Sequence, residues 1–497
     1  MSSADALLRT QNSVASPMDE VPELALEELQ GELVAGARRG ERVAALFGAP
    51  EANGTRLVAV LASDRDGTVR IGRSAPLRES FPSLTPHLPA VHLFEREIFE
   101  QHDLRPEGHP WPKPVRFPPR AGVASAIGIA DFYKIDGDEV HEVGVGPVHA
   151  GVIEPGHFRF QCHGENVMHL EISLGYQHRG VERAVVTGDP RRRLHYLETA
   201  AGDTTIGHAT AYAQLVEALA GSRVSARAHA LRAIALELER MANHTGDLGA
   251  LAGDVGFQPT AAFCGRLRGD WLNLSAELCG NRFGRGLVRP GGLGFDVDAA
   301  RVGRMAEAVE RAVAEVGQAA DLLWDTPSVM SRFEDTGRVT REQAEEVGLV
   351  GPAARASGLT QDVRTTHPTG IYRVAQIPAA TWDSGDVFAR AYVRWLEVRR
   401  SAEFADDLLG SLPGGDVRAS CGALAPDHLC VSLVEGWRGE ICHVGWTDGS
   451  GRLAGYKIVD PSFHNWIGLA LALRGQQISD FPLCNKSFNL SYCGFDL

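Results

Sequence analysis

The chain has 497 residues, which exceeds the usual length of one domain and predicts at least two. Its 44% hydrophobic and 23% charged residues are typical of a globular protein and exclude a wholly disordered or fibrous chain. The formal net charge of -14, without a basic run, argues against a nucleic-acid partner or a polybasic membrane-surface binder.

No apolar run approaches the roughly 20 residues that cross a bilayer, and the first residues lack a signal-peptide pattern. We therefore expect a peripheral protein on the cytoplasmic side of the cell membrane. The eight cysteines are scattered, which argues against a disulfide scaffold, and no pair has C-x-x-C spacing.

The first part of the chain predicts a tail and a small α+β domain. Residues 1–22 are small and polar, which is typical of a flexible tail. A helical pattern covers residues 23–47. Two strand-like runs follow at 56–62 and 68–72, and an Asp-Gly turn joins them. We expect this domain to span residues 23–120.

A proline-rich stretch separates this domain from a second one. Six prolines lie between residues 103 and 123, where their missing backbone donor disfavours helix and sheet. We expect a linker at 121–140 and a large, mainly helical domain at 141–497, so the predicted fold class is α+β. Periodic apolar residues predict long helices at 225–248, 302–324 and 387–409.

The densest polar stretch is residues 144–182. It holds His149, Arg179 and Glu182 among glycines that let the backbone approach closely. A turn-rich connection with satisfied histidines would explain the same composition.

A second stretch, residues 199–208, precedes a helix. Asp203, Thr204 and Thr205 are residue types that cap a helix N-terminus, and His208 would then lie in the first turn. Capping alone would explain them.

Three further segments carry charge or apolar residues of interest. The charges along the helix at 225–248 predict a solvated face. The loop at 281–292 has three arginines among glycines but lacks the strand–GxxxxGK[ST]–helix context of a phosphate loop. The C-terminal residues 480–497 are apolar and predict a terminus tied into the core.

These motifs resemble the large subunit of membrane-associated [NiFe] hydrogenases of the formate hydrogenlyase and hydrogenase-4 type. They are also similar to the homologous 49 kDa-type subunit of respiratory complex I. The N-terminal part resembles the 30 kDa-type subunit, fused in front. The resemblance covers about residues 25 to 497 and rests on residues 95–98, 108–110, 146–149, 154–160, 175–182, 236–247 and 285–292.

In the hydrogenases four thiolates from two C-x-x-C pairs hold the nickel. Aligned on the family motifs, the first pair falls on Ala201 and Thr204, and the second falls on Ser491 and Gly494. All four thiolates are missing. The resemblance therefore implies a large subunit without a nickel–iron centre, as in the complex I subunit.

The resemblance also implies a quinone site. The family's Gly-Pro-x-His loop bonds the quinone headgroup, and its matching residues here are Gly146 and His149. Arg289 of the glycine-rich loop completes the predicted cofactor-binding set. The family's tyrosine falls near Gly202, where no tyrosine stands.

Four residues form the predicted catalytic set: His149, Arg179, Glu182 and His208. Glu182 matches the glutamate that relays protons in the hydrogenases. An ion pair of Glu182 with Arg179 or Arg183 is the structural alternative.

Three functions follow from the resemblance. The first is a redox module that takes electrons from a [4Fe–4S] small subunit of complex I type and passes them to quinone. Antiporter-like membrane subunits, and a formate- or NADH-oxidising subunit, would be further partners. The second is a non-catalytic scaffold that links a partner enzyme to the membrane arm. The third is a hydrogenase with atypical metal ligands.

Overall fold

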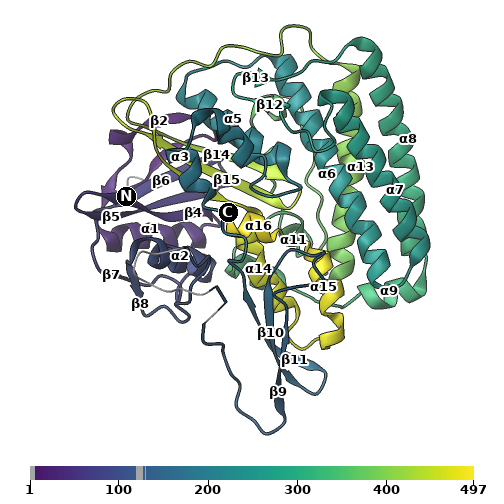
Figure 1. Cartoon of the computed structure of the whole chain (residues 1–497), viewed down its shortest axis with the longest axis horizontal. Helices are drawn as coiled ribbons and strands as arrows, with labels where there is room; N and C mark the ends of the chain where they lie inside the picture. The colour runs from purple at the N-terminus through teal and green to yellow at the C-terminus, as the bar shows by residue number, and fades with distance from the viewer. Residues whose placement is uncertain (1–5, 119–126, 129) are drawn as a thin grey trace.

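The computed structural model describes residues 6–118, 127–128 and 130–497, and it confirms the α+β class (Figure 1). Part of the linker expected at 121–140 lies outside the described residues. The described helices include none that is both long and apolar enough to cross a bilayer.

The N-terminal part is built on a five-stranded sheet in which β4, β5 and β6 are antiparallel neighbours. The helix expected over 23–47 is wrong in its second half, because residues 42–51 form β4. An apolar run of this length fits a buried strand as well as a helix, so periodicity alone cannot separate them. The elements are β1 (Leu8–Thr10), β3 (Glu23–Leu24), α1 (Leu26–Arg38), β4 (Arg42–Glu51), β5 (Gly54–Ser63), β6 (Thr68–Ser74) and α2 (His92–His102).

The expected flexible tail is also wrong for the residues that the structure describes. β1 pairs with β6, and β2 (Ala15–Pro17) pairs with β14 (His428–Gly436) of the C-terminal sheet. Asn12, between these strands, is only 2% exposed. The N-terminus therefore joins the two parts of the chain.

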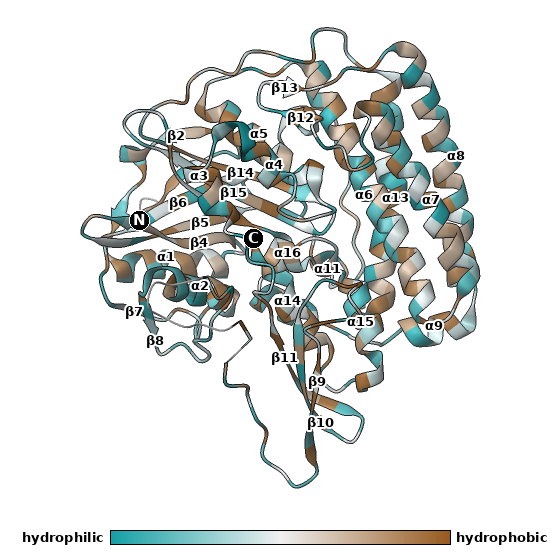
Figure 2. Ribbon diagram, in the orientation of Figure 1, coloured by the Kyte–Doolittle hydropathy of each residue, from teal (hydrophilic) through white to brown (hydrophobic). Residues whose placement is uncertain are grey.

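A bundle of four long helices forms one side of the molecule (Figure 1). All three predicted long helices are confirmed, and a fourth completes the bundle. In Figure 2 the outer helices carry both hydrophilic and hydrophobic residues, as expected for helices with one buried face. The bundle consists of α6 (Ala226–Asp254), α7 (Gln258–Cys279), α8 (Ala299–Trp324) and α13 (Val387–Gly410).

A C-terminal sheet lies between the bundle and the N-terminal sheet (Figure 1). Helix α5 packs on β14 and β15, and the C-terminal helices are buried, so the expected tied-in terminus is confirmed. The elements are α5 (Thr205–Leu219), β14 (His428–Gly436), β15 (Gly439–Thr447), β16 (Leu453–Val459), α14 (Pro461–Ala472), α15 (Phe481–Phe488) and α16 (Tyr492–Asp496).

A three-stranded sheet, β11-β10-β9, projects from the C-terminal helices (Figure 1). Its bounds are β9 (Val140–Val145), β10 (His157–His163) and β11 (Asn166–Ser173). The short elements are β7 (Ser80–Pro82), β8 (Arg105–Glu107), α3 (Val181–Thr187), α4 (Arg193–Leu197), β12 (Val288–Arg289), β13 (Gly292–Leu293), α9 (Pro327–Phe333), α10 (Arg341–Glu346), α11 (Gly351–Arg355) and α12 (Val363–Thr366).

Candidate functional site

Two motifs that are far apart in the sequence, residues 199–208 and 480–497, meet in the interior. Arg438 follows β14 and joins them. Its Nη1 donates a hydrogen bond to Thr204 Oγ1 at 3.3 Å, and its Nε donates to the carbonyl of Asn489 at 2.5 Å. The sheet thus brings a guanidinium between the two motifs.

Arg179, a predicted site residue, forms a second link between the same motifs. Its Nη1 donates to the carbonyl of Thr199 at 2.7 Å. Its Nη2 donates to the carbonyls of Ala200 at 2.8 Å and Cys493 at 3.1 Å. Arg179 is therefore a positioning residue, and it does not form the ion pair with Glu182 that was the alternative.

The four family nickel positions lie in these motifs, and we call Ala201, Thr204, Ser491 and Gly494 the two-motif site. All four residues are buried. A Cβ added to Gly494 would lie 2.7 Å from Cγ and Oδ2 of Asp460, so a carboxylate occupies the space of a fourth thiolate. These side chains do not fit a nickel centre, because none offers a soft thiolate ligand.

Cys493 adjoins the two-motif site but does not supply the missing set. It is 9% exposed, and burial and the nearby Glu154 raise the pKa of its thiol to about 11. It therefore stays protonated at neutral pH. The described residues contain no group of three or more histidine, cysteine or acidic side chains placed to hold a metal ion.

A chain of buried polar side chains leads away from the two-motif site. His208 Nε2 lies 3.1 Å from Asp460 Oδ2, and His208 Nδ1 lies 3.0 Å from His443 Nε2. His443 Nδ1 lies 2.8 Å from the hydroxyl of Tyr456. All four side chains are at most 5% exposed.

Local structure explains this alignment. Asp460 directly follows β16 and caps α14, where its Oδ1 accepts a hydrogen bond from the amide of Ser462 at 2.8 Å. His443 and Tyr456 stand on the paired strands β15 and β16, and α5 places His208 above them.

Burial and neighbouring groups set the protonation of His443 and Asp460. Burial lowers the pKa of His443 well below its usual value, and the neighbouring His208 lowers it further. Burial raises the pKa of Asp460, but the bond to His208, the charges of His208 and Arg438 and the bond to Ser462 together outweigh this effect, and the net pKa lies below normal. At neutral pH Asp460 is ionised and His443 is neutral.

His149 lies in the loop that covers the C-terminal motif. Its Nε2 lies 2.8 Å from the carbonyl oxygen of Gly156, so the imidazole contacts its own loop. Gly146 has a φ of 84°, and the His149 ring and the carbonyl of Gly156 both pack against its Cα. A Cβ at this position would clash with both groups. The loop reaches the site through Glu154, whose Oε1 accepts from the amide of Cys493 at 3.3 Å.

Glu182 belongs to an ion cluster between the N-terminal and C-terminal parts. Its Oε1 accepts from the amide of Ile458 at 2.9 Å and lies 3.0 Å from Lys457 Nζ. Lys457 also pairs with Glu97 of α2 at 2.6 Å, and Arg116 pairs with the same carboxylate. Glu182 therefore forms an ion pair with Lys457, whereas the alternative had named Arg179 or Arg183 as its partner.

The C-terminus is held by the loop that carries Arg179. The amides of Gly175 and Gln177 donate to the two oxygens of Asp496, each at 2.7 Å. The amide of Arg179 donates to the carbonyl of Leu497 at 2.8 Å. Burial raises the pKa of Asp496 to about 6, although these two amide bonds oppose the shift.

Arg289 is not brought to the two-motif site by any bond between described residues. Its Nε donates to the carbonyl of Gly286 at 3.1 Å, and its own carbonyl accepts from Arg232 at 2.8 Å. The glycine-rich loop approaches the first motif elsewhere, where the amide of Gly286 donates to Glu198 at 2.6 Å.

Two interpretations of the motif helices are wrong. The charged face of α6 is buried, not solvated: Arg232, Glu237, Glu239, Arg240, His244 and Asp247 are all at most 8% exposed. No side chain of the first motif caps α5. Instead Glu239 reaches across from α6 and accepts from the amides of Ile206 at 2.7 Å and Gly207 at 3.2 Å.

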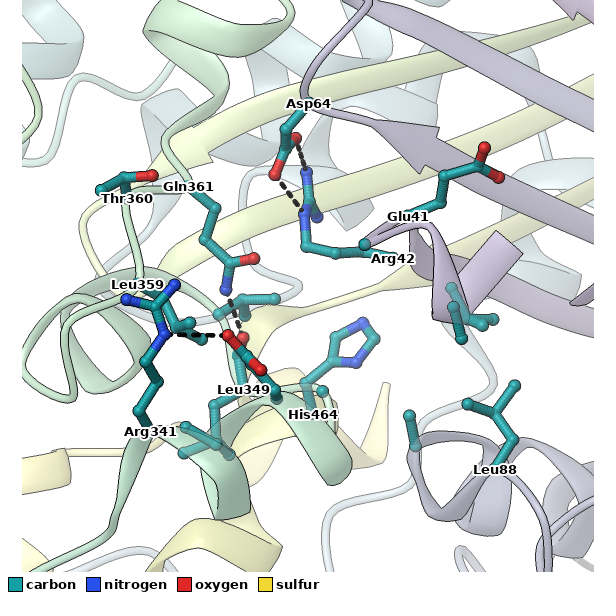
Figure 3. A pocket seen from close by; sticks show the side chains of 18 of the residues that line it. Glu41, Arg42, Asp64, Leu88, Arg341, Leu349, Leu359, Thr360, Gln361 and His464 are labelled. Carbon is teal, nitrogen blue, oxygen red and sulfur yellow. Dashed lines mark hydrogen bonds and ion pairs between the residues drawn. The ribbon is translucent and has the colours of Figure 1, made fainter. Parts of the chain in front are cut away.

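A separate cavity of about 440 Å³ lies between α1, β4, α10 and α14, away from the predicted site residues (Figure 3). Arg42 lines it and forms a two-bond ion pair with Asp64, at 3.0 and 2.8 Å. The imidazole of His464 points into it and is 7% exposed (Figure 3). Burial and the charge of Arg42 lower the pKa of His464 to about 4.

The arrangement defines a class: a 30 kDa-type part joined to a large-subunit part whose buried site is formed by an internal and a C-terminal motif. Family models for the respiratory-chain NADH dehydrogenase 30 Kd and 49 Kd subunits match residues 30–122 and 254–427.

Similar proteins point to the same class. The chain is 30% identical to formate hydrogenlyase subunit 5 of Escherichia coli, over 92% of this chain and 84% of that protein. It is 28% identical to hydrogenase-4 component G of Escherichia coli, over 83% and 75% of the two chains. It is also 28% identical to NADH-quinone oxidoreductase subunit 4 of Thermus thermophilus, over 69% and 90%.

The chain therefore belongs to the family of hydrogenase large subunits and complex I 49 kDa-type subunits, with a fused 30 kDa-type part. It is an oxidoreductase-type subunit of a multi-subunit complex. Sequence reasoning missed Asp460, Arg438, His443 and Tyr456. The Asp460-Pro461-Ser462 helix start was a visible signal, but no sequence pattern placed the other three beside the motifs.

Proposed function

We propose that this chain forms the acceptor site of a complex I-like or hydrogenase-4-like complex. Electrons pass from a [4Fe–4S] partner subunit to a quinone or a similar acceptor at the two-motif site, coupled to proton uptake. The site would work without a nickel–iron centre.

The buried pair Asp460–His208 carries this proposal. Burying a carboxylate and an imidazole costs free energy, and a protein that only needed a packed core would gain from apolar side chains there. Titratable groups kept at a site that lacks its thiolates support proton chemistry.

The loop of His149 supports an acceptor that enters from outside. Val148 is 74% exposed and Val152 is 83% exposed, next to His149 at the edge of the site. Apolar side chains around a polar imidazole suit an acceptor with an apolar ring and polar oxygens. We assign His149 the bond to the acceptor and Glu182 a place in proton transfer.

The partners follow from the relatives' names, which include NADH-quinone oxidoreductase and formate hydrogenlyase subunits. We propose antiporter-like membrane subunits and a formate- or NADH-oxidising subunit as partners, with this chain peripheral on the cytoplasmic side. A non-catalytic scaffold is the second candidate. The bond of His149 to its own loop and the glycine at position 202 favour it.

The test uses the complex purified with its native partners. Nickel and iron content, hydrogen uptake and reduction of a short-chain quinone are measured on one sample. Iron without nickel, with quinone reduction, supports the proposal. Nickel near one per chain with hydrogen turnover would establish a hydrogenase with atypical ligands instead.

His149→Ala separates the redox module from the scaffold. Loss of quinone reduction in an intact complex supports the module, and unchanged activity supports the scaffold. His163→Ala is the matched control, because His163 lies on the same projecting sheet with an exposed side chain.

A further inference from the structure

We propose that Tyr456, His443, His208 and Asp460 form a proton relay that ends at the two-motif site, where Asp460 delivers the proton to the acceptor. This inference rests on the proposed function and names the residues that would supply its protons. None of His443, Tyr456 and Asp460 belongs to the site predicted from the sequence.

The hydrogen bonds of the relay have one consistent direction. When Asp460 is ionised and His208 carries one proton, that proton lies on Nε2 in the bond to the carboxylate, and His208 Nδ1 is left as an acceptor. His443 Nε2 then donates to His208, and His443 Nδ1 accepts from the Tyr456 hydroxyl. In this arrangement every hydrogen bond of the relay has one donor and one acceptor.

The same contacts allow the reverse pattern. Moving each proton one step takes the Tyr456 hydroxyl proton to His443 Nδ1. The His443 Nε2 proton then moves to His208 Nδ1, and the His208 Nε2 proton moves to Asp460 Oδ2. Three O–H or N–H bonds break and three form, both imidazoles change tautomer, and no heavy atom has to move far.

Asp460 then passes its proton to an oxygen of the acceptor after two electrons have arrived from the reduced iron–sulfur partner. Its carboxylate lies against Gly494 within the two-motif site, which places it for this transfer. The net change is one proton lost from Tyr456 and one gained by the reduced acceptor, so a quinone leaves this step as its singly protonated anion.

The outer end of the relay lies beside Tyr212, on the side of a partly exposed arginine. The ring of Tyr212 lies 6.3 Å from that of Tyr456 and is 6% exposed. Tyr212 in turn hydrogen-bonds Arg193, which is partly exposed on α4. Tyr456 is therefore the relay residue nearest to a route by which its proton is replaced.

A purely structural role explains these residues less well. A buried network that only held the fold together would be replaceable by apolar side chains at little cost. Here the polar side chains form a continuous series of hydrogen bonds across two strands and a helix. The series begins at the two-motif site.

The test compares Tyr456→Phe with wild type in the complex purified with its partners, using reduced methyl viologen as electron donor. A short-chain quinone accepts electrons and protons, whereas ferricyanide accepts electrons alone. We expect quinone reduction to fall about hundred-fold or more, as for loss of a positioned proton-transfer group, with an altered solvent isotope effect. The ferricyanide rate should not change.

Tyr372→Phe is the matched control. Tyr372 is also buried, at 8% exposure, and its hydroxyl donates to one buried side chain, Glu237, at 2.6 Å. It lies outside the relay, so its variant should keep the wild-type quinone rate. Asp460→Asn is the second relay variant and should lose quinone reduction in the same way.

The possible failures are distinguishable. If the wild-type complex reduces no quinone, the proposed function fails and the relay fails with it. If wild type reduces quinone and both Tyr456→Phe and Asp460→Asn match its rate and isotope effect, the relay alone is overturned. If the ferricyanide rate falls in parallel, the residues serve structure and the relay is also overturned.

Discussion

Arg438 and Asp203 form a two-bond ion pair, with Nη1 2.5 Å from Oδ1 and Nη2 2.9 Å from Oδ2. The same guanidinium stacks 3.8 Å from the ring of Trp437 and bonds the carbonyl of Asn489. The charge of Asp203 raises the pKa of Arg438 although burial opposes this. In this chain a guanidinium therefore joins the two motifs that thiolates and nickel join in the hydrogenases.

We predict that Arg438→Met destabilises the protein by about 2 kcal/mol. Breaking a buried ion pair typically costs about 3–5 kcal/mol, and we lower this value because the Asp203 side chain is 32% exposed. Urea unfolding of the purified protein measures the change. Arg452→Met is the control, because its pair with Asp448 is exposed, and its effect should stay below about 1 kcal/mol. Equal effects of the two variants would contradict the prediction.

Gly494→Ala should also destabilise the protein, by about 1–3 kcal/mol, as overpacking of a buried site does. The new Cβ would lie 2.7 Å from the Asp460 carboxylate, so one of the two must move. In an Asp460→Ala background the cost should disappear, and a double-mutant cycle in urea measures this coupling. A cysteine at position 494 would meet the same obstacle.

Gly202→Ala provides the control for this cycle. Gly202 lies next to Ala201 of the two-motif site, and an added Cβ there meets no atom within 4 Å. Its substitution should be neutral or slightly stabilising. An unchanged urea midpoint for Gly494→Ala would show that Asp460 is not held against the glycine.

The low pKa of His464 predicts that the folded protein loses stability in acid. Its pKa is about 4 in the folded protein and about 6.5 in an unfolded chain. Between these values the unfolded state binds more protons, so the free energy of unfolding falls as the pH falls from 6.5 to 4. At pH 5 this group alone accounts for about 2 kcal/mol.

Urea midpoints at pH 7 and pH 5 measure this effect. His464→Gln should shrink the difference between them, whereas His163→Gln, on an exposed side chain, should leave it unchanged. A pH dependence that survives His464→Gln intact would assign the acid sensitivity to other buried histidines.

The long helices and the strand pair β5–β6 could be predicted because apolar periodicity and turn chemistry are local. The boundary between α1 and β4 could not, because Val43 to Phe47 form an apolar run that suits either element. The charged face of α6 was misread for a related reason. A sequence shows that Glu237 and Arg240 are charged, but only the packed structure shows that both are 0% exposed.

For the candidate site too, the sequence predicted some residues, and only the packed structure showed the others. Resemblance located the four positions of the two-motif site and Arg179, which the structure brings together. It did not locate Asp460 or His443, because strand pairing and the packing of α5 set their contacts. His149 and Glu182 lie near the site, but their roles remain predictions.

The N-terminal segment offers the last prediction, because it was expected to be a tail and instead contacts both parts of the chain. Asn12 Nδ2 donates to the carbonyls of His367 at 2.8 Å and Leu433 at 2.9 Å, and its Oδ1 accepts from the amide of Leu433 at 2.8 Å. Asn12→Ala leaves these buried groups unpaired and should cost about 3 kcal/mol. Urea unfolding measures the loss, and limited proteolysis should show faster cleavage near the N-terminus.

Asn53→Ala, at an exposed turn, is the control and should change stability by less than about 0.5 kcal/mol. If both variants unfold at the wild-type midpoint, β1 and β2 contribute nothing to the stability of the core.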